Sequence, residues 1–138
     1  INKMDIRIKD TKDVFRLLGD ELRFERREKV KLLILNIKNI LLKIVDVSYG
    51  GTHNAILETK DVFAEPIKMG APRIILVHNH PSGDPTPSVE DVMLTRDMYR
   101  AGLLLGIVLI DHVVIGYNKC KSIFADRRDM IIGWNFFR

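Results

Sequence analysis

The chain has 138 residues, of which 46% are hydrophobic, with 22 basic and 18 acidic side chains. A chain of this length can bury one globular core, and its apolar content excludes a disordered protein. Its single cysteine, Cys120, excludes a disulfide framework and any zinc site built from several cysteines. The net charge of +4 suits a soluble protein as well as a nucleic-acid binder, so charge alone identifies no partner.

Two features bear on cellular location. The longest apolar run, residues 101–110, is too short to cross a bilayer, and the N-terminus lacks the apolar core of a secretory signal. With the lone cysteine, this predicts a cytoplasmic protein without membrane contact. The chain begins at Ile1 rather than at methionine, so we expect that an upstream region is missing. The sequence leaves the oligomeric state open.

The first third of the chain predicts one helix followed by a hairpin. Residues 11–24 carry apolar side chains at helical spacing. Residues 29–35 and 40–47 are rich in strand formers, and Lys38-Asn39 between them is a turn signal. We expect Gly50-Gly51 to end the second strand.

The rest of the chain predicts alternating helices and strands. The expected order is helix, strand, loop, helix, strand and a further strand that pairs with the previous one: residues 61–69, 73–79, 81–87, 88–105, 107–115 and 119–124. Pro66 weakens the first of these helices. The run Ile74-Ile75-Leu76-Val77 has no polar alternation, which fits a strand covered on both faces. The pattern predicts a single mixed α/β domain, with a sheet flanked by helices.

The segment that follows the buried strand carries candidate chemistry. His78 and His80 are two residues apart on a predicted strand, so both imidazoles can face one ion. Asp91 lies in the first turn of the next helix and can add a carboxylate. Two histidines and a carboxylate are a common catalytic zinc set, with the fourth position left to water. Asp84 and Glu90 are further carboxylates nearby, so the third ligand is ambiguous on physical grounds.

A structural interpretation explains the same residues. Ser88 and Asp91 have the spacing of a helix capping box, which needs no metal. Two histidines on a buried strand can also be hydrogen-bonded core residues. The spacing alone therefore leaves a metal site and a purely structural role open.

The segment from His78 to Asp91 resembles the JAMM, or MPN-plus, metalloprotease motif. That motif has a glutamate, then His-x-His, seven residues and Ser-x-x-Asp. The full string HNHPSGDPTPSVED resembles the RadC branch of the superfamily more closely still. Further similarities occur at Leu105-Gly106-Ile107 and Asp111-His112, and the resemblance runs from about Ile8 to Phe124.

The resemblance implies a fold and a domain. It implies the JAB/MPN architecture, which is cytidine-deaminase-like: an α/β domain with a mixed, mostly antiparallel sheet flanked by helices. Residues 1–138 would form one RadC-like JAB/MPN metallohydrolase domain, without the upstream helix-hairpin-helix region of full-length relatives. Relatives usually carry Pro-Arg where this chain has Thr59-Lys60, so a role of that arginine in substrate contact is not carried over.

The resemblance also implies roles for individual residues. His78, His80 and Asp91 correspond to the zinc ligands, and Ser88 corresponds to the serine that supports the tetrahedral intermediate. The catalytic glutamate of the family precedes the first strand, a place that Glu28 occupies. One helical turn earlier, Glu25 competes for the same role. We assign Asp111-His112 a structural or supporting role. Asn79, on the opposite face of the strand, is a poor candidate for orienting the imidazoles.

These observations predict a zinc-dependent hydrolase that cleaves a peptide or isopeptide bond in a peptide or protein substrate. Glu28 would accept a proton from water and deliver it to the leaving amine. One alternative is a DNA-repair-associated role with weak DNA association. The basic stretch from Arg23 to Lys31 could support that role, but it also fits a solvated surface. The other alternative is a metal-stabilised binding module without turnover.

Overall fold

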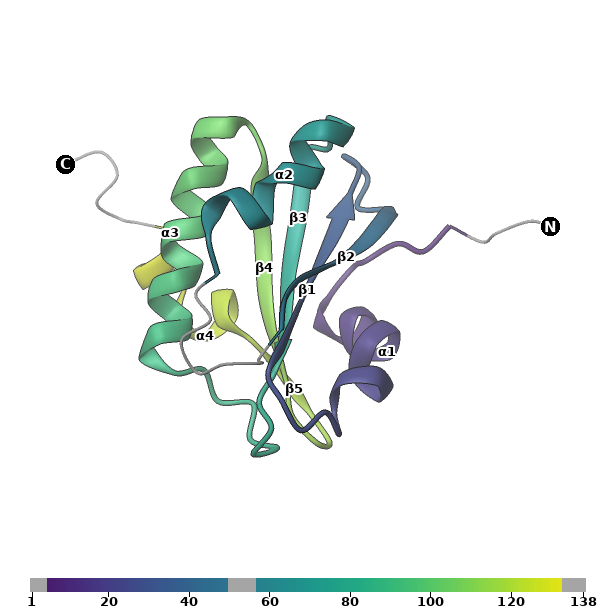
Figure 1. Ribbon diagram of the computed structural model, residues 1–138, viewed down its shortest axis with the longest axis vertical. Helices are drawn as coiled ribbons and strands as arrows, with labels where there is room; N and C mark the ends of the chain where they lie inside the picture. The colour runs from purple at the N-terminus through teal and green to yellow at the C-terminus, as the bar shows by residue number, and fades with distance from the viewer. Residues whose placement is uncertain (1–4, 50–56, 133–138) are drawn as a thin grey trace.

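A five-stranded sheet in the order β2-β1-β3-β4-β5 forms the centre of the computed structural model, which describes residues 5–49 and 57–132 (Figure 1). The strands are β1 (Lys29–Leu35), β2 (Leu41–Tyr49), β3 (Arg73–Asn79), β4 (Val108–Ile115) and β5 (Cys120–Ser122). The helices are α1 (Thr11–Leu22), α2 (Thr59–Met69), α3 (Val89–Leu105) and α4 (Ile123–Ile131). Only β3 and β4 pair in parallel; the other neighbouring pairs are antiparallel. The mixed, mostly antiparallel sheet that the resemblance implies is therefore confirmed.

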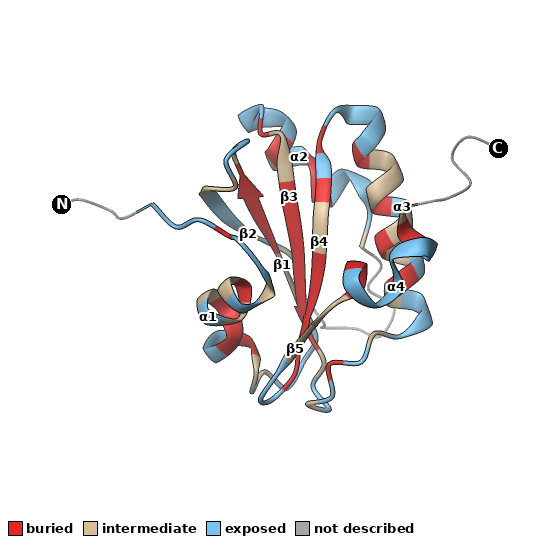
Figure 2. Cartoon of the chain, turned by 180° about the vertical axis from the view of Figure 1, so that it is seen from behind, coloured by how far each residue is buried: buried red, intermediate tan, exposed pale blue. Residues whose placement is uncertain are grey.

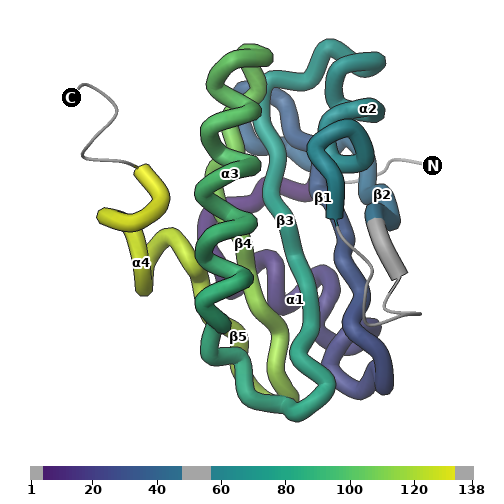
Figure 3. Tube along the Cα trace, turned by 60° about the vertical axis from the view of Figure 1, so that its left-hand side comes forward, coloured from purple at the N-terminus to yellow at the C-terminus, as the bar shows by residue number. Residues whose placement is uncertain are grey.

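Helices cover both faces of the sheet. On one face, Val14, Leu18 and Leu22 follow helical spacing along α1 and pack with side chains of β1, β3 and β4. On the other face, α2, α3 and α4 enclose a second core cluster (Figure 3). The central strands β1, β3 and β4 are accordingly buried over most of their length (Figure 2). Within the described ranges, none of the helices has the length and apolar character needed to cross a bilayer.

The hairpin between β1 and β2 forms where the sequence predicts it. The Asn36 side chain accepts hydrogen bonds from the backbone N–H groups of Lys38 and Ile40. Asn39 adopts a positive φ of 63°, a conformation that asparagine tolerates better than most residues. The expected break at Gly50-Gly51 lies outside the described residues.

The second helix runs through its proline. α2 begins at Thr59, two residues before the predicted start, and continues past Pro66 to Met69. Pro66 is buried with Val62 and Phe63, so packing against the core outweighs its poor helix propensity. Gly70, with a φ of 66°, ends the helix in the left-handed conformation.

The expected final strand over residues 119–124 pairs with β4 as predicted but is shorter than predicted. Only Cys120–Ser122 pair with β4, and the chain then enters α4 at Ile123. The Ser122 hydroxyl explains the change, because its oxygen accepts a hydrogen bond from the Ala125 N–H and so caps the new helix. The same hydroxyl donates to the Asp111 carboxylate of β4, which fixes the start of α4 against the sheet.

The topology brings three distant segments to one edge of the sheet. β3 and β4 are parallel, and the connection between them runs through a loop and α3, so α3 begins beside the end of β3 (Figure 3). β1 is antiparallel to β3, with Val30 opposite His78, so β1 begins at this same edge. The residues just before β1, just after β3 and at the start of α3 therefore meet.

Candidate metal centre

Four side chains that can bind a metal converge at this edge. One ligand atom each from Glu28, His78, His80 and Asp91 lies within 4.8 Å of the other three. The Nε2 atoms of the two histidines are 3.2 Å apart. The Asp91 carboxylate spans both, with Oδ1 at 3.3 Å from the His78 Nε2 and Oδ2 at 3.0 Å from the His80 Nε2. The i, i+2 spacing on β3 thus aims both imidazoles at one point.

Asp91 joins the cluster and caps its helix at the same time. Its Oδ2 accepts a hydrogen bond of 2.9 Å from the Ser88 N–H, and the Asp91 N–H donates to the Ser88 hydroxyl oxygen at 3.0 Å. This reciprocal pair is the capping box of α3. The structural and the metal-site interpretations of the sequence are therefore compatible, because one carboxylate serves both.

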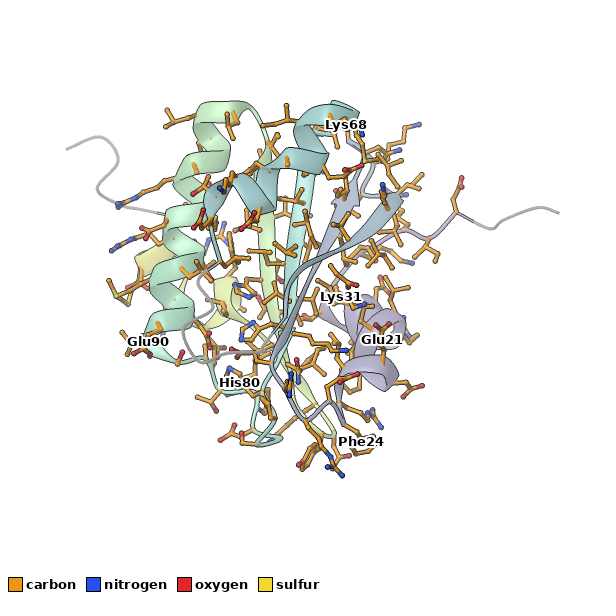
Figure 4. The ribbon with its side chains drawn as sticks, in the orientation of Figure 1. Glu21, Phe24, Lys31, Lys68, His80 and Glu90 are labelled. Carbon is orange, nitrogen blue, oxygen red and sulfur yellow. The ribbon has the colours of Figure 1, made fainter. Side chains whose placement is uncertain are left out.

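The competing carboxylates lie elsewhere. The Asp84 carboxylate accepts hydrogen bonds from the backbone N–H and the hydroxyl of Thr86. Glu90 is exposed at the start of α3, and its side chain lies apart from the labelled His80 (Figure 4). Glu25 forms an ion pair with Lys29 at 3.3 Å. Geometry thus brings Asp91, and neither Asp84 nor Glu90, to the histidines.

Glu28 lies at the rim of the cluster. Its Oε2 is 3.6 Å from the Nε2 of His78 and 4.0 Å from that of His80. Its side chain is 51% exposed, whereas that of Asp91 is 14% exposed. Glu28 is therefore farther from the imidazoles than Asp91 and more accessible to a molecule arriving from solvent.

Asn79 fixes the backbone on both sides of Glu28. Its side-chain oxygen accepts a hydrogen bond of 2.7 Å from the Lys29 N–H, and its amide nitrogen donates to the Arg27 carbonyl at 3.1 Å. Asn79 is 1% exposed. It does not contact the imidazoles, as the strand alternation predicts, but it supports the carboxylate opposite them.

Replacing Asn79 with alanine is expected to lower the free energy of unfolding by about 1–3 kcal/mol, because three backbone groups lose this partner in a partly buried place. Urea denaturation of the metal-free protein measures the change. The control is Asn118→Ala in the exposed bend before β5, for which we expect less than about 0.5 kcal/mol. Equal effects for the two variants would contradict the role of the Asn79 side chain.

The hydrogen-bond partners determine where the proton of His80 lies. Its Nδ1 is 2.9 Å from the Asp84 carbonyl oxygen, which can only accept, so Nδ1 carries the hydrogen. The loop that supplies this carbonyl is held by Gly83, whose φ is 90° and whose missing Cβ leaves room for the Tyr117 ring. The neutral form of His80 therefore presents its Nε2 lone pair to the cluster.

Two buried residues form a chain of hydrogen bonds to His78: His112 contacts the His78 ring, and Thr95 contacts His112. Its Nδ1 lies 2.8 Å from the Nε2 of His112, and the Nδ1 of His112 lies 2.6 Å from the Thr95 hydroxyl oxygen. Burial, reinforced by the neighbouring His78, keeps the pKa of His112 well below its ordinary value. An imidazole in its neutral form carries one proton and offers one lone pair, so His112 can donate to one neighbour and accept from the other.

The electrostatics of the cluster favour a cation. Partial burial works against ionisation of Asp91, but the two imidazoles and the Ser88 N–H outweigh it and hold the pKa of the carboxyl well below its ordinary value. The hydrogen bond to Asp91 raises the pKa of His80, although burial opposes it. Two imidazole nitrogens and two carboxylates thus converge with their lone pairs on a small volume. This donor set fits a divalent metal ion.

Two residues around the cluster, Thr95 and His112, have contacts that the sequence did not predict. Thr95 was not singled out for chemistry, although it lies one helical turn after Asp91 and so on the same face of α3. His112 was assigned a structural or supporting role, but its hydrogen-bond partners were not predicted.

The hydroxyl oxygen of Ser88 accepts a hydrogen bond from the Asp91 N–H, and Ser88 is exposed. No described contact ties Ser88 directly to the imidazoles.

A family model described as the RadC-like JAB domain matches residues 8–129 of the chain. The chain belongs to the RadC-like JAB domain family. The match includes Glu28, both histidines and Asp91, and it agrees with the resemblance carried by the motif.

Curated relatives of this RadC-like JAB domain are similar over most of its length. A "UPF0758 protein" of Moorella thermoacetica is 46% identical over 116 residues, which cover 84% of this chain and 51% of the relative. One from Clostridium botulinum is 46% identical over 110 residues, covering 80% of this chain and 48% of the relative. One from Clostridium novyi is 40% identical over 116 residues, covering 84% and 51%. The chain thus spans about half the length of these relatives, whose names state no activity.

Proposed function

We propose that this RadC-like JAB domain is a zinc-dependent hydrolase that cleaves a peptide or isopeptide bond. The observation that carries the proposal is the convergence of four ligand atoms within 4.8 Å of one another. Membership of the JAB family supports it, because catalytic metal sites recur there. Histidine and carboxylate ligands suit several divalent ions, and zinc is the ion most used with two histidines and one carboxylate in hydrolases.

The geometry divides the four residues into two roles. His78, His80 and Asp91 are the less exposed members and lie closest together, so they would hold the metal. Bound zinc supplies Lewis acidity, which polarises a carbonyl group and makes water a better nucleophile near neutral pH. Glu28, half exposed at the rim, would take the proton from water and return it to the leaving nitrogen.

Ser88 would contribute a hydrogen bond in the transition state. Its oxygen accepts from the Asp91 N–H, so its hydroxyl proton is free to donate to an oxygen that gains negative charge. Donors of this kind typically contribute about 3 kcal/mol to the stability of such a transition state. The N-terminal end of α3 adds a favourable dipole at the same place.

We expect removal of the metal to lower both the stability of the folded protein and its hydrolytic activity, and restoration of the metal to recover both. Free zinc at a hundred times its dissociation constant should stabilise the folded protein by about 2.7 kcal/mol, and a chelator should reverse the gain. Thermal denaturation of protein purified without a histidine tag measures this shift. Elemental analysis of the same sample identifies the metal.

A peptide library, analysed by mass spectrometry with and without the chelator, then tests hydrolysis. Cleavage that stops with chelator and returns with zinc supports the proposal. Zinc binding without cleavage of any peptide would leave a metal-stabilised binding module. A DNA gel shift at low salt without cleavage would favour the DNA-linked alternative. A protein that neither binds zinc nor gains stability from it would overturn the proposal.

A further inference from the structure

We propose that Thr95 and His112 are positioning residues that keep the proton of His78 on Nδ1, so that its Nε2 lone pair faces the metal site. The inference rests on the proposed metal centre and deepens it. Both residues lie outside the motif of histidines, serine and aspartate. Thr95 is fully buried on α3, and His112 is 1% exposed on β4. In such places water cannot replace a missing hydrogen-bond partner.

The direction of the hydrogen bonds is set at Thr95. Its hydroxyl oxygen lies 2.6 Å from the backbone carbonyl of Asp91 and 2.6 Å from the Nδ1 of His112. A carbonyl oxygen can only accept, so the single hydroxyl proton goes to Asp91. The Thr95 oxygen must then accept from His112, which places the proton of His112 on Nδ1.

The same logic carries the direction on to the metal site. His112 is 1% exposed, and burial disfavours a second proton on its ring, so with its proton on Nδ1 it keeps a lone pair on Nε2, 2.8 Å from the Nδ1 of His78. His78 therefore donates from Nδ1, and its own lone pair lies on Nε2. The reverse order would place a hydrogen on the His78 Nε2, facing Asp91 and only 3.2 Å from the Nε2 of His80. That arrangement could not bind a metal.

Asp91 participates at both ends of this chain of hydrogen bonds. Its backbone carbonyl accepts the Thr95 proton, and its carboxylate lies against the Nε2 of His78. Because Thr95 is four residues after Asp91, the first turns of α3 supply both groups. A fault in the chain of hydrogen bonds is thus expected to weaken metal binding without removing a ligand.

The test compares Thr95→Val with Thr95→Ser. Valine has nearly the shape of threonine but no hydroxyl, whereas serine keeps it. We expect zinc affinity, measured by competition with a chromophoric chelator, to fall about 10- to 100-fold in Thr95→Val and to stay near the parent value in Thr95→Ser. Nitrogen NMR of the imidazoles in the metal-free proteins should show the His78 proton on Nδ1 in the parent and partly on Nε2 in Thr95→Val.

A second pair of variants keeps the test decisive if Thr95→Val fails to fold. His112→Gln offers an amide oxygen that can accept the His78 proton, and His112→Leu offers nothing. We expect His112→Gln to bind zinc more tightly than His112→Leu. The control for packing damage is Leu109→Ala, in the buried core of β4 and paired with Ile74 rather than with a proposed ligand, which should lower stability and leave zinc affinity unchanged.

Parent-like zinc affinity in Thr95→Val, or an unchanged His78 proton in that variant, would overturn the inference. Equal loss in His112→Gln and His112→Leu would overturn it as well. The NMR result needs neither metal nor substrate, so failure of the hydrolase proposal would show separately, as a lack of peptide cleavage.

Discussion

Asp91→Asn is expected to abolish zinc binding while α3 keeps its folded start. The amide oxygen of asparagine can still accept the hydrogen bond from the Ser88 N–H, so the helix cap survives. The substitution removes the negative charge that lies 3.0 and 3.3 Å from the two imidazoles. Because loss of a supporting contact already costs about 10- to 100-fold in metal affinity, we expect loss of a ligand to cost more. Chelator competition and elemental analysis measure the effect.

Two controls separate ligation from capping in that experiment. Ser88→Ala removes the acceptor for the Asp91 N–H and should cost about 1 kcal/mol of stability, but it should retain zinc. Asp91→Ala should show both losses together. If Asp91→Asn bound zinc as tightly as the parent, the carboxylate would be a helix cap alone, and the assignment of Asp91 as a ligand would fail.

Glu28→Gln is expected to retain zinc and to lose turnover about 10²- to 10⁴-fold, the usual contribution of a general acid–base group. Glutamine keeps the size of the side chain at the rim of the cluster but cannot accept a proton from water. Zinc content and the rate of cleavage of any peptide found in the library measure the two effects in the same sample. The prediction separates Glu28 from the three residues that would hold the metal.

Glu25→Gln is the matched control for this variant. Glu25 is paired with Lys29 and lies outside the cluster, so its replacement should change the rate little. If Glu25→Gln lost turnover and Glu28→Gln did not, the register of the catalytic glutamate would be wrong. If Glu28→Gln lost zinc, Glu28 would be a ligand rather than a base.

The sequence predicted those parts of the fold in which local signals and packing agree. The strand over Arg73–Asn79 carries four consecutive apolar residues, Ile74 to Val77, before its histidine, and it is observed with the predicted bounds. The hairpin at Lys38-Asn39 follows from local turn chemistry. Near residue 122 the sequence predicted the pairing with β4 but not the turn into α4. The Ser122 hydroxyl caps this helix locally, and it also donates to Asp111, eleven residues earlier, a contact that no short window of sequence contains.

For the candidate site too, the local features could be predicted from the sequence and the contacts between distant segments could not. The i, i+2 histidines and the following carboxylate are visible in sequence because strand alternation and helix capping are local rules. The residues that position these groups through hydrogen bonds could not be identified from the sequence. Thr95 meets His112 only because α3 packs on β4, and Asn79 reaches Lys29 only because β1 pairs with β3. Such contacts between distant segments need the topology before they can be named.

The Asp91 carboxylate serves both the helix cap and the proposed metal site, so release of a bound metal would be coupled to fraying of this helix end. If the first turn of α3 opens, the carboxylate leaves the imidazoles as well as the Ser88 N–H. A bound cation would therefore stabilise the folded form of that turn. Its release would allow the segment between β3 and α3 to sample other conformations. Occupancy of the centre and local order of this connection would thus rise and fall together.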